Sequence, residues 1–489
     1  MAAHRIAVIG GDGIGPEVID QAVRVAERAA KLDNSELSWN RLPWSTAYYK
    51  QHGKMLPDDG WDTLAKHDAV LFGAVGDPSV PDKITVHELL LPMRRKFDQY
   101  VNLRPAYLFA GVPCPLVGKA AGSIDMMVYR ENTEGEYAPV GGRLYPGTAD
   151  EVAVQTGVFT RRGCERILRA AFEAARKRPR KKLTSITKSN AQVWGLGLWD
   201  DAFAAVRTEY PDVESAPLLV DAAAMDFVRK PESFDVVVAS NLFGDILTDL
   251  SAAVTGSIGL ASSANVNPTK KFPSMFEPVH GSAPDIAGKG IANPLAAVLS
   301  AALMLDHLGL TAAAKATRDA VAKVLAEGKV KTADLGGTAT TTQMGDAVLA
   351  AVNTRESMPT GPEIILALKV LVTAVTVLFA CAVAAILAGR KRLHGRLNIA
   401  FFVLTMTTVF GFEVLLRLGT DVTATFSDEA RQALRVHLRF AVPAAAVMPV
   451  MLWSGLTGRK WLHVPLAAVF VVLWVGTFVT GVFFLPHDG

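Results

Sequence analysis

The sequence predicts an α/β fold of two subdomains in an α/β/α arrangement, followed by an all-α transmembrane bundle. First, short runs rich in β-formers alternate with amphipathic stretches up to about residue 353. Such alternation indicates helices packed on a largely parallel sheet. Second, the composition changes near residue 357, where Gly, Pro and charges give way to long apolar runs. Third, 489 residues are enough for two or three domains.

Three segments follow from this change of composition. We expect residues 1–356 to form the α/β part, 357–363 a linker and 364–489 a four-helix transmembrane domain. The linker is expected because NTRESMPTGPE, residues 353–363, contains the Pro, Gly and Ser that interrupt regular structure.

The predicted strands of the first part are apolar on both faces, as burial between two helix layers requires. A helix with one apolar face is predicted for CERILRAAFEAARKR, residues 164–178. The strand runs are RIAVIG (5–10), DAVLFGAV (68–75), IDMMVYRE (124–131), LTSITKSN (183–190), PLLVDAAAM (217–225) and FDVVVASN (234–241).

The stretch GGDGIGPEV, residues 10–18, approaches a dinucleotide-binding fingerprint but does not match it. The third glycine of GxGxxG would fall at Pro16, and no acid ends the next strand region, ELSWNRLPW. We therefore expect a tight glycine turn that opens a helix, with Pro16 in its first turn.

Bulk properties exclude several classes of function. A net charge of +3 without a basic stripe argues against a nucleic-acid partner. The three cysteines have neither zinc-site nor disulfide spacing, which is typical of a reducing compartment. The N-terminus, MAAHRIAVIGG, lacks the pattern of a secretory signal and is expected to begin the first strand.

Two acids follow the apolar run FDVVVA within SNLFGDILTDL, residues 240–250. Asp245 and Asp249 are four residues apart, so in a helix both carboxylates lie on one face. A helix-end acid beside a surface acid is one interpretation. Because Asp221 also follows an apolar run, a Mg²⁺ or Mn²⁺ site lined by oxygen is the other.

Further candidate residues lie in the same part of the chain. Arg130, Tyr137, Lys188 and Asn190 stand at the ends of predicted strands, where open α/β sheets bind ligands. Arginines there can grip carboxylates through two parallel hydrogen bonds. Alone, a lysine would be a surface residue and a tyrosine a core residue. The candidates are Arg94, Arg104, Arg130, Tyr137, Lys188 and Asn190.

Residues 4–352 resemble the isocitrate/isopropylmalate dehydrogenase superfamily, particularly its tartrate and D-malate dehydrogenase (decarboxylating) branch. The phrases that carry this resemblance are GDGIGPEV, LLLPMRRKFDQYVNLRP, RENTEGEY, QTGVFTRRG, TKSN, VVASNLFGDILTDL and MFEPVHGSAPDIAGKGIANP. The resemblance implies an isopropylmalate-dehydrogenase-like fold. Its cofactor-side subdomain would span about 1–98 and 254–356, and its dimer and metal-side subdomain about 99–253.

The resemblance also implies a homodimer with shared active sites. The metal ligands would be Asp245 and Asp249, with Asp221 contributed by the other subunit. Lys188, also from the other subunit, would accept the hydroxyl proton, and Tyr137 would protonate the enolate carbon. Substrate carboxylates would be bound by Arg94, Arg104 and Arg130, with Asn190 beside them.

The loop that begins at EPVHGSAPD resembles the family's cofactor loop. Asp285 would bind the ribose hydroxyls, and because a carboxylate repels a 2′-phosphate, NAD is implied rather than NADP. NADP-using relatives carry Lys-Tyr where this chain has Asp285-Ile286. The implied cofactor-binding residues are His280, Gly281, Ser282, Ala283, Asp285 and Asn293.

The implied reaction is metal-dependent oxidative decarboxylation of a small 2-hydroxy diacid, D-malate or tartrate. Where near relatives read SLWGLLLPIRR, this chain reads TVHELLLPMRR. The resemblance implies that His87 and Glu88 would face the variable end of the substrate. This polar wall disfavours the alternative substrate 3-isopropylmalate, whose isopropyl group needs apolar contact. A second alternative is a membrane redox or assembly module with an accessory dehydrogenase domain.

Four apolar segments follow the linker, each about as long as a bilayer span. They cover about 364–388, 398–418, 438–457 and 461–484. Trp453, Trp461 and Trp474 are candidates for interfacial anchors. We expect a multi-pass membrane protein.

The loop charges conflict with the expected location of the enzyme. If all four segments span, Arg390, Lys391, Arg392, Arg396, Arg459 and Lys460 lie opposite the enzyme, which would put that end in the cytoplasm. An NAD-dependent enzyme without an export signal belongs in the cytoplasm, and we expect it there. A first segment that Lys369 prevents from spanning, or a fusion arising from gene prediction, would also resolve the conflict.

The histidines of this part suggest a further hypothesis. With alternating spans, His394 and His463 fall at one face, and His437 and His487 at the other. Two such pairs could ligate haems or metals, or all four could be ordinary interfacial histidines.

Overall fold

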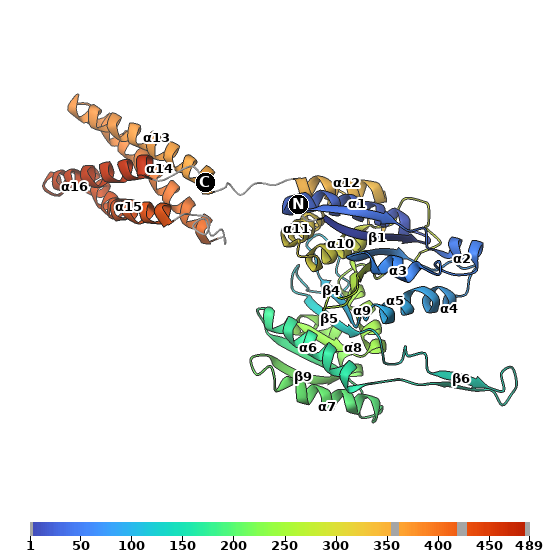
Figure 1. Cartoon of the computed structure of the whole chain (residues 1–489). Coiled ribbons are helices and arrows are strands. Elements are labelled where there is room, and N and C mark those ends of the chain that lie inside the picture. Colours follow the sequence, from blue (N-terminus) through green and yellow to red (C-terminus); the bar gives the residue numbers. More distant parts are fainter. Residues whose placement is uncertain (1–2, 354–360, 418–427, 485–489) are drawn as a thin grey trace. The chain divides into compact units, whose positions relative to one another are not determined.

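A computed structural model describes residues 3–353, 361–417 and 428–484. The chain divides into two compact units, residues 1–354 and 355–489. Figure 1 shows an α/β unit and an all-helical unit. The boundary agrees with the change of composition in the sequence, although residues 354–360 of the linker region lie outside the described part.

The α/β unit is built on a ten-stranded sheet with the order β2-β1-β3-β12-β11-β4-β5-β10-β8-β9. Six neighbouring pairs are parallel, and the three pairs that involve β11 or β4 are antiparallel. The strands are β1 (Ala3–Gly11), β2 (Glu36–Arg41), β3 (Ala69–Ala74), β4 (Val101–Tyr107), β5 (Asp125–Glu131), β8 (Lys182–Thr187), β9 (Glu214–Leu219), β10 (Val236–Ala239), β11 (Ser262–Val266) and β12 (Ser274–Pro278).

Helices from both ends of the unit pack together. In Figure 1 the blue N-terminal elements lie beside the yellow α10–α12, while the green elements form the other part of the unit. The helices are α1 (Gly15–Ala30), α2 (Thr46–His52), α3 (Gly60–Ala65), α4 (Asp82–Thr85), α5 (Leu91–Lys96), α6 (Arg161–Lys177), α7 (Gly195–Arg207), α8 (Val220–Arg229), α9 (Asn241–Val254), α10 (Leu295–His307), α11 (Thr311–Glu327) and α12 (Thr341–Asn353). The unit also contains a π-helical turn η2 (Val86–Leu90) and the 3₁₀ turns η1 (Lys31–Asp33), η3 (Pro231–Ser233), η4 (Ile258–Leu260) and η5 (Ala333–Leu335).

The described part of the α/β unit contains three hydrophobic cores. One core joins α1 and β1 to α10, α11 and α12. A second lies between 101 and 247, around Phe172, Trp199 and Phe227, all of which are fully buried. The third core is formed by apolar side chains between residues 7 and 97 together with Met275. Residues of β4 and β5 belong to the second core, and Ala264 of β11 belongs to the first.

The sheet departs from the expected strands at its centre. The sequence does not predict β4, β11 or β12, because the strand β4 is embedded in an Arg-rich phrase and β11 and β12 are only five residues long. Asn102 and Asn265 are fully buried on these strands, and Asn102 donates to Asn265 Oδ1 at 3.0 Å. A buried amide pair of this kind breaks the apolar pattern on which strand prediction depends.

A two-stranded arm extends from the green part of the unit in Figure 1. Its strands β6 (Gly141–Leu144) and β7 (Val152–Gln155) pair only with each other in the described part. Every residue of both strands is exposed, including Leu144, Val152 and Val154. An isolated hairpin is at best marginally stable in water, and the described part of the chain leaves the apolar side chains of this arm uncovered.

The second unit consists of α13 (Gly361–Leu387), α14 (Lys391–Arg417), α15 (Asp428–Leu456), α16 (Lys460–Val479) and the π-helical turn η6 (Thr480–Phe484). The predicted linker therefore ends earlier than residue 363, because 361–363 belong to α13. Phe379, Phe401, Phe470 and Trp474 form its centre, and Trp474 Nε1 donates to Thr376 Oγ1 at 3.1 Å.

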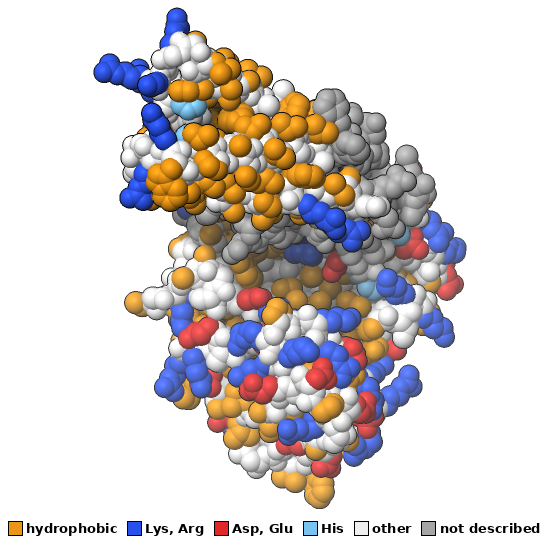
Figure 2. Space-filling model, turned by 90° about the vertical axis from the view of Figure 1, so that its left-hand side faces the viewer, with side chains coloured by type: hydrophobic (Ala, Val, Ile, Leu, Met, Phe, Trp, Pro, Cys, Tyr) orange, Lys and Arg blue, Asp and Glu red, His pale blue; other side chains and the backbone are white. Residues whose placement is uncertain are grey.

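Three segments of this unit are long and apolar enough to cross a membrane: Lys369–Leu387, Arg435–Leu456 and Lys460–Val482. The remaining predicted segment, 398–418, lies mostly in α14, and its side chains from residue 408 onward are outside the described part. Figure 2 shows an outward surface on this unit that is dominated by hydrophobic side chains. In each segment, 17% of the apolar window is buried within the chain, so the packing of this unit leaves most of these side chains exposed.

Each of the three described histidines of this unit hydrogen-bonds to another residue of the unit. His394 contacts Ala382 O at 2.7 Å, and His463 contacts Met451 O at 3.0 Å. His437 contacts Thr480 Oγ1 at 3.1 Å. His487 lies outside the described residues. The pairing of these histidines around a haem or metal therefore stays a prediction.

Candidate active site

The candidate site forms where β4 and β5 face the first turns of α9. Arg104 projects from β4 and Arg130 from β5, and Asp245 and Asp249 project from α9. Gly244 makes this approach possible, because a Cβ there would lie 2.6 Å from the side chain of Arg130. The i,i+4 spacing places both carboxylates on one face of α9, and Arg104 approaches both of them.

Arg130 is 1% exposed and is held by two side chains of α9. Its Nε and Nη2 donate to Asn241 Oδ1 at 3.0 and 2.7 Å, and its Nη1 donates to Asp245 Oδ1 at 2.5 Å. Burial lowers the pKa of Arg130, and the charge of Asp245 opposes that effect. Sequence reasoning missed Asn241, although it stands three residues before Gly244 in the phrase SNLFGD.

Arg104 reaches the same carboxylates from the neighbouring strand. Its Nη1 lies 3.3 Å from Asp245 Oδ1 and 3.5 Å from Asp249 Oδ1, and it donates to Thr248 Oγ1 at 2.6 Å. The side chain is only 10% exposed, while that of Asp249 is 63% exposed. The site thus has a buried cationic floor and an accessible carboxylate at its rim.

The two aspartates have opposite pKa shifts. Burial alone would raise the pKa of Asp245, but Arg130, Arg104 and a hydrogen bond from Tyr137 together lower it. Partial desolvation raises the pKa of Asp249, and Arg104 offsets this only in part. For Asp249, burial therefore disfavours the ionised carboxylate more than the nearby arginines favour it.

Tyr137 completes this cluster. Its hydroxyl donates to Asp245 Oδ2 at 2.7 Å, and its ring lies 5.2 Å from the guanidinium carbon of Arg130. Burial and the neighbouring carboxylate raise the pKa of the phenol, so it stays protonated at neutral pH. A protonated phenol in contact with ionised groups can serve as a general acid.

Arg94 is held beside this cluster by an acid that sequence reasoning missed. Its Nη2 lies 3.1 Å from Glu277 Oε1, and each side chain is 10% exposed. Glu277 also accepts a hydrogen bond from Asn265 at 2.7 Å. A glutamate at the end of the apolar stretch SMFEP was the available signal.

Lys188 and Asp221 form a separate pair. Lys188 Nζ donates to Asp221 Oδ1 at 2.7 Å, and the contact lowers the pKa of Asp221. Asp221 lies in the first turn of α8 rather than at the end of a strand, and Asn190 is exposed nearby in sequence. Within the described part of a single chain, no three His, Cys, Asp or Glu residues come close enough to hold a metal ion.

The cofactor-loop residues lie between β12 and α10. Gly281 and Asp285 are exposed, and Ala283 adopts a φ of 40°, which is unusual for a residue with a side chain. His280 is largely buried, which lowers its pKa, and its Nε2 has no hydrogen-bond partner in the described part. Asn293 is buried and donates to Asp334 Oδ2 at 2.9 Å.

The glycine turn supports this loop. Gly11 and Gly13 have φ values of 74° and 59°, and α1 begins at Gly15 with Pro16 in its first turn, as the sequence predicted. Ile14 N donates to Ser282 O at 2.8 Å. The turn therefore contacts the cofactor loop, a relationship that the sequence did not indicate.

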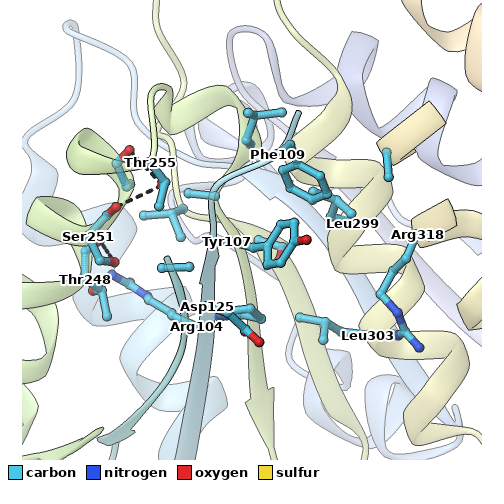
Figure 3. A pocket seen from close by; sticks show the side chains of 18 of the residues that line it. Arg104, Tyr107, Phe109, Asp125, Thr248, Ser251, Thr255, Leu299, Leu303 and Arg318 are labelled. Carbon is cyan, nitrogen blue, oxygen red and sulfur yellow. Dashed lines mark hydrogen bonds between the residues drawn. The ribbon is translucent and has the colours of Figure 1, made fainter. Parts of the chain in front are cut away.

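A cavity of about 430 Å³ lies beside the cluster of arginines and aspartates around Asp245 (Figure 3). Arg104 and Thr248 lie on one side, and Leu299, Leu303 and Arg318 on the other. Tyr107 and Phe109 stand between them with ring centroids 4.9 Å apart. Arg104 thus contributes to both the carboxylate cluster and this cavity.

Comparison with known proteins identifies the family. Residues 5–348 match the family model described as isocitrate/isopropylmalate dehydrogenase. D-malate dehydrogenase [decarboxylating] of Escherichia coli (strain K12) is 53% identical over 355 residues, which is 71% of this chain and 98% of the relative. Tartrate dehydrogenase/decarboxylase of Pseudomonas putida is 50% identical over 358 residues, again 71% and 98%.

Solved structures agree with this assignment. Isocitrate dehydrogenase from Methylococcus capsulatus has a TM-score of 0.65 and 36% identity, and the match covers 72% of this chain and all of that one. The TT0538 protein from Thermus thermophilus has a TM-score of 0.64 and 35% identity, with 72% and 69% covered. The chain therefore belongs to the isocitrate/isopropylmalate dehydrogenase family and is an enzyme of its decarboxylating hydroxy-acid dehydrogenase type.

Proposed function

We propose that this enzyme catalyses NAD- and Mn²⁺- or Mg²⁺-dependent oxidative decarboxylation of D-malate or tartrate. The observation that carries the proposal is the convergence of Arg104, Arg130 and Tyr137 on Asp245, one helical turn from Asp249. This cluster combines groups for binding an anion, ligating a cation and donating a proton.

A dicarboxylate fits the cationic part of the site. The guanidinium groups of Arg94, Arg104 and Arg130 are buried. Their carboxylate partners are Glu277, Asp245 and Asp249. Arginine can bind each substrate carboxylate through two parallel hydrogen bonds. Arg94 and Arg104 also have buried Nε atoms without partners in the described part, so unused donors are present.

Asp245 and Asp249 suit a hard divalent cation. Both supply carboxylate oxygens, and the raised pKa of Asp249 indicates that its charge is poorly compensated by the protein alone. When bound, the cation would polarise the substrate oxygen and stabilise negative charge during loss of CO₂. Tyr137 would then donate its proton to the enolate carbon.

We propose that a second copy of the chain completes the site with Asp221 and Lys188. Lys188 would accept the proton of the substrate hydroxyl as hydride leaves for NAD⁺. The apolar arm β6–β7 supports a homodimer, because it offers Leu144, Val152 and Val154 for a partner to cover. Met225 on α8 and Ile246 on α9 are also exposed, at 56% and 58%.

The choice of NAD rests on the loop 279–293. Asp285 is exposed in the middle of this loop, where its carboxylate would accept hydrogen bonds from the ribose hydroxyls and repel a 2′-phosphate. Gly281 has open space where a Cβ would be, which leaves room for a ligand to approach the backbone.

The choice of substrate rests on the π-helical turn η2. His87 and Glu88 are both exposed on this turn, immediately before the helix that carries Arg94. Their polarity suits a second hydroxyl, as in tartrate, or a small substrate with solvent beyond it, as in D-malate. An isopropyl group would find no apolar contact with these two side chains.

We propose that the second unit is embedded in a membrane, with the enzyme facing the cytoplasm. Three apolar helical segments with mostly outward-facing hydrophobic side chains support this location. Protease treatment of sealed inside-out and right-side-out vesicles tests it. Digestion of the enzyme unit in inside-out vesicles alone is expected, and digestion in right-side-out vesicles alone would contradict it.

A substrate panel tests the reaction. Full-length chain in detergent should reduce NAD⁺ with D-malate or tartrate and Mn²⁺, and residues 1–356 should do the same. A higher kcat/KM for 3-isopropylmalate than for both proposed substrates would overturn the substrate assignment. No NADH with any 2-hydroxy diacid would overturn the reaction itself.

A further inference from the structure

We infer that Asp12 is a positioning residue for the cofactor loop, acting through the glycine turn that touches Ser282. This inference rests on the proposed binding of NAD at residues 279–293. Asp12 lies between Gly11 and Gly13, in the stretch that approaches a phosphate-binding motif. Its contacts give it a role in holding the loop that requires no contact with phosphate.

The carboxylate of Asp12 joins three segments that are distant in sequence. Its Oδ1 accepts from Thr46 N at 2.9 Å, and its Oδ2 accepts from Gly76 N at 3.0 Å and from the hydroxyl of Thr46. Its own backbone N donates to Ala74 O at 2.7 Å. Asp12 therefore ties the β1–α1 turn to the start of α2 and to the segment after β3.

The turn held in this way is in close contact with the cofactor loop. Ile14 N donates to Ser282 O at 2.8 Å. A Cβ at Gly13 would lie 1.9 Å from Ser282 O, and a Cβ at Gly76 would lie 3.4 Å from Ser282 Oγ. Since Gly76 and the turn are both anchored on Asp12, one carboxylate sets the two backbone surfaces against which Ser282 packs.

The backbone of the cofactor loop is strained at Ala283 and needs neighbouring contacts to hold it. Ala283 has a φ of 40°, a conformation that costs free energy for a residue with a side chain and persists only when neighbouring contacts hold it. Asp285 follows two residues later and would bind the ribose. A displaced Ser282 would therefore move Asp285 and weaken NAD binding, while leaving Asp245, Asp249 and their arginines in place.

The test compares Asp12→Ala, Asp12→Asn and Gly13→Ala in the full-length protein. We expect Asp12→Ala to raise the Kd for NADH, measured by fluorescence titration, and the KM for NAD⁺ about tenfold, since it removes three hydrogen bonds to a carboxylate. The value of kcat at saturating NAD⁺ should change less than about threefold, because the catalytic groups stay in place. Asp12→Asn, which keeps one acceptor oxygen, should fall between the wild type and Asp12→Ala.

Gly13→Ala reaches the loop by another route, because its Cβ collides with Ser282 O. It should also weaken NADH binding and accelerate amide hydrogen exchange in residues 280–286 without cofactor. Asp68→Ala is the matched control, since Asp68 Oδ2 accepts from Arg5 N at 2.7 Å and likewise links β3 to β1, away from the loop. It should lower Tm without changing the Kd for NADH.

Two outcomes would overturn the inference. One is a wild-type Kd for NADH in Asp12→Ala, and the other is an equal rise in Kd in the Asp68→Ala control. Both differ from failure of the proposed function, in which the wild-type protein itself would not bind NADH. If Asp12→Ala does not fold, Asp12→Asn decides the question, and a wild-type Kd for NADH with wild-type exchange of residues 280–286 in that variant would overturn the inference.

Discussion

The hydroxyl of Tyr137 donates a hydrogen bond to Asp245 Oδ2 at 2.7 Å, so the proposed proton donor and a proposed metal ligand are in direct contact. Burial and this carboxylate raise the pKa of the phenol, which keeps the proton on Tyr137 across the neutral range. We predict that Tyr137→Phe lowers kcat roughly 100-fold, the usual contribution of a positioned acid. Steady-state kinetics checks this, and a kcat within about threefold of wild type would exclude Tyr137 as the donor.

Arg130→Lys should damage both stability and activity. Lysine keeps the charge but loses the fork that binds Asn241 through two nitrogens and Asp245 through the third. We expect the free energy of unfolding to fall by about 3 kcal/mol, because a buried charge network loses its geometry. Urea unfolding measures this change, with Arg143→Lys on the exposed arm as a control that should unfold as the wild type does.

Asp249→Asn should separate the metal requirement from folding. The change removes a charge that the protein compensates poorly, as its raised pKa indicates, and it preserves the shape of the side chain. We expect loss of Mn²⁺-dependent turnover with a metal-free Tm that is equal to or higher than that of wild type. Retained activity with an unchanged dependence on Mn²⁺ would contradict the assignment of Asp249 as a ligand.

The pH dependence of Mn²⁺ binding follows from the same group. A carboxylate must be ionised to bind a metal, and desolvation raises the pKa of Asp249 above 3.8. As pH falls from neutrality, Asp249 therefore gains its proton earlier than an ordinary aspartate, and the rise in Tm caused by Mn²⁺ should shrink. Differential scanning calorimetry with and without Mn²⁺ measures this effect, and the dependence should disappear in Asp249→Asn.

The two aspartates differ in how they affect stability without metal. The pKa of Asp245 is lowered in the folded state, so its stabilising effect is present above the unfolded pKa and is lost as pH falls through the folded one. Asp249 has the opposite sign, because its folded-state pKa is raised and its ionisation opposes folding. This difference explains why Asp249, rather than Asp245, is the safer position at which to remove a charge.

Asp285→Lys should change the cofactor preference. Replacing the carboxylate by a cation removes the acceptor for the ribose hydroxyls and attracts a 2′-phosphate. We expect the ratio of kcat/KM for NADP⁺ to that for NAD⁺ to rise roughly tenfold or more. Asp319→Lys on α11, where the exposed carboxylate pairs with Lys315, is the control and should leave the ratio unchanged.

Much of the α/β fold could be predicted because its outer strands obey simple rules. Runs such as FDVVVASN are apolar on both faces, and the helices between them have one apolar side. The central strands could not be found in this way, because Asn102 and Asn265 are buried in a hydrogen-bonded pair that interrupts the apolar pattern. Likewise, the exposed arm β6–β7 has no core contacts in the described part to impose a periodicity.

The candidate site divides in the same way. The pairing of Asp245 with Asp249 follows from helical spacing, and the structure places both beside Arg104. Other contacts of the site join chain segments that are distant in sequence, so no local pattern could reveal them. They are Arg130 to Asn241, Arg94 to Glu277 and Ile14 to Ser282. The proposed role of Lys188 in catalysis rests on a second copy of the chain, whereas within one chain its Nζ donates to Asp221 Oδ1.

The most direct measurement is the simultaneous release of NADH and CO₂ by the full-length protein in detergent. With D-malate or tartrate, NAD⁺ and Mn²⁺, we predict equal amounts of the two products, and removal of Mn²⁺ by a chelator should abolish both. Formation of NADH without CO₂ from either substrate would contradict the proposed decarboxylation. Turnover that persists after chelation would contradict the role given to Asp245 and Asp249.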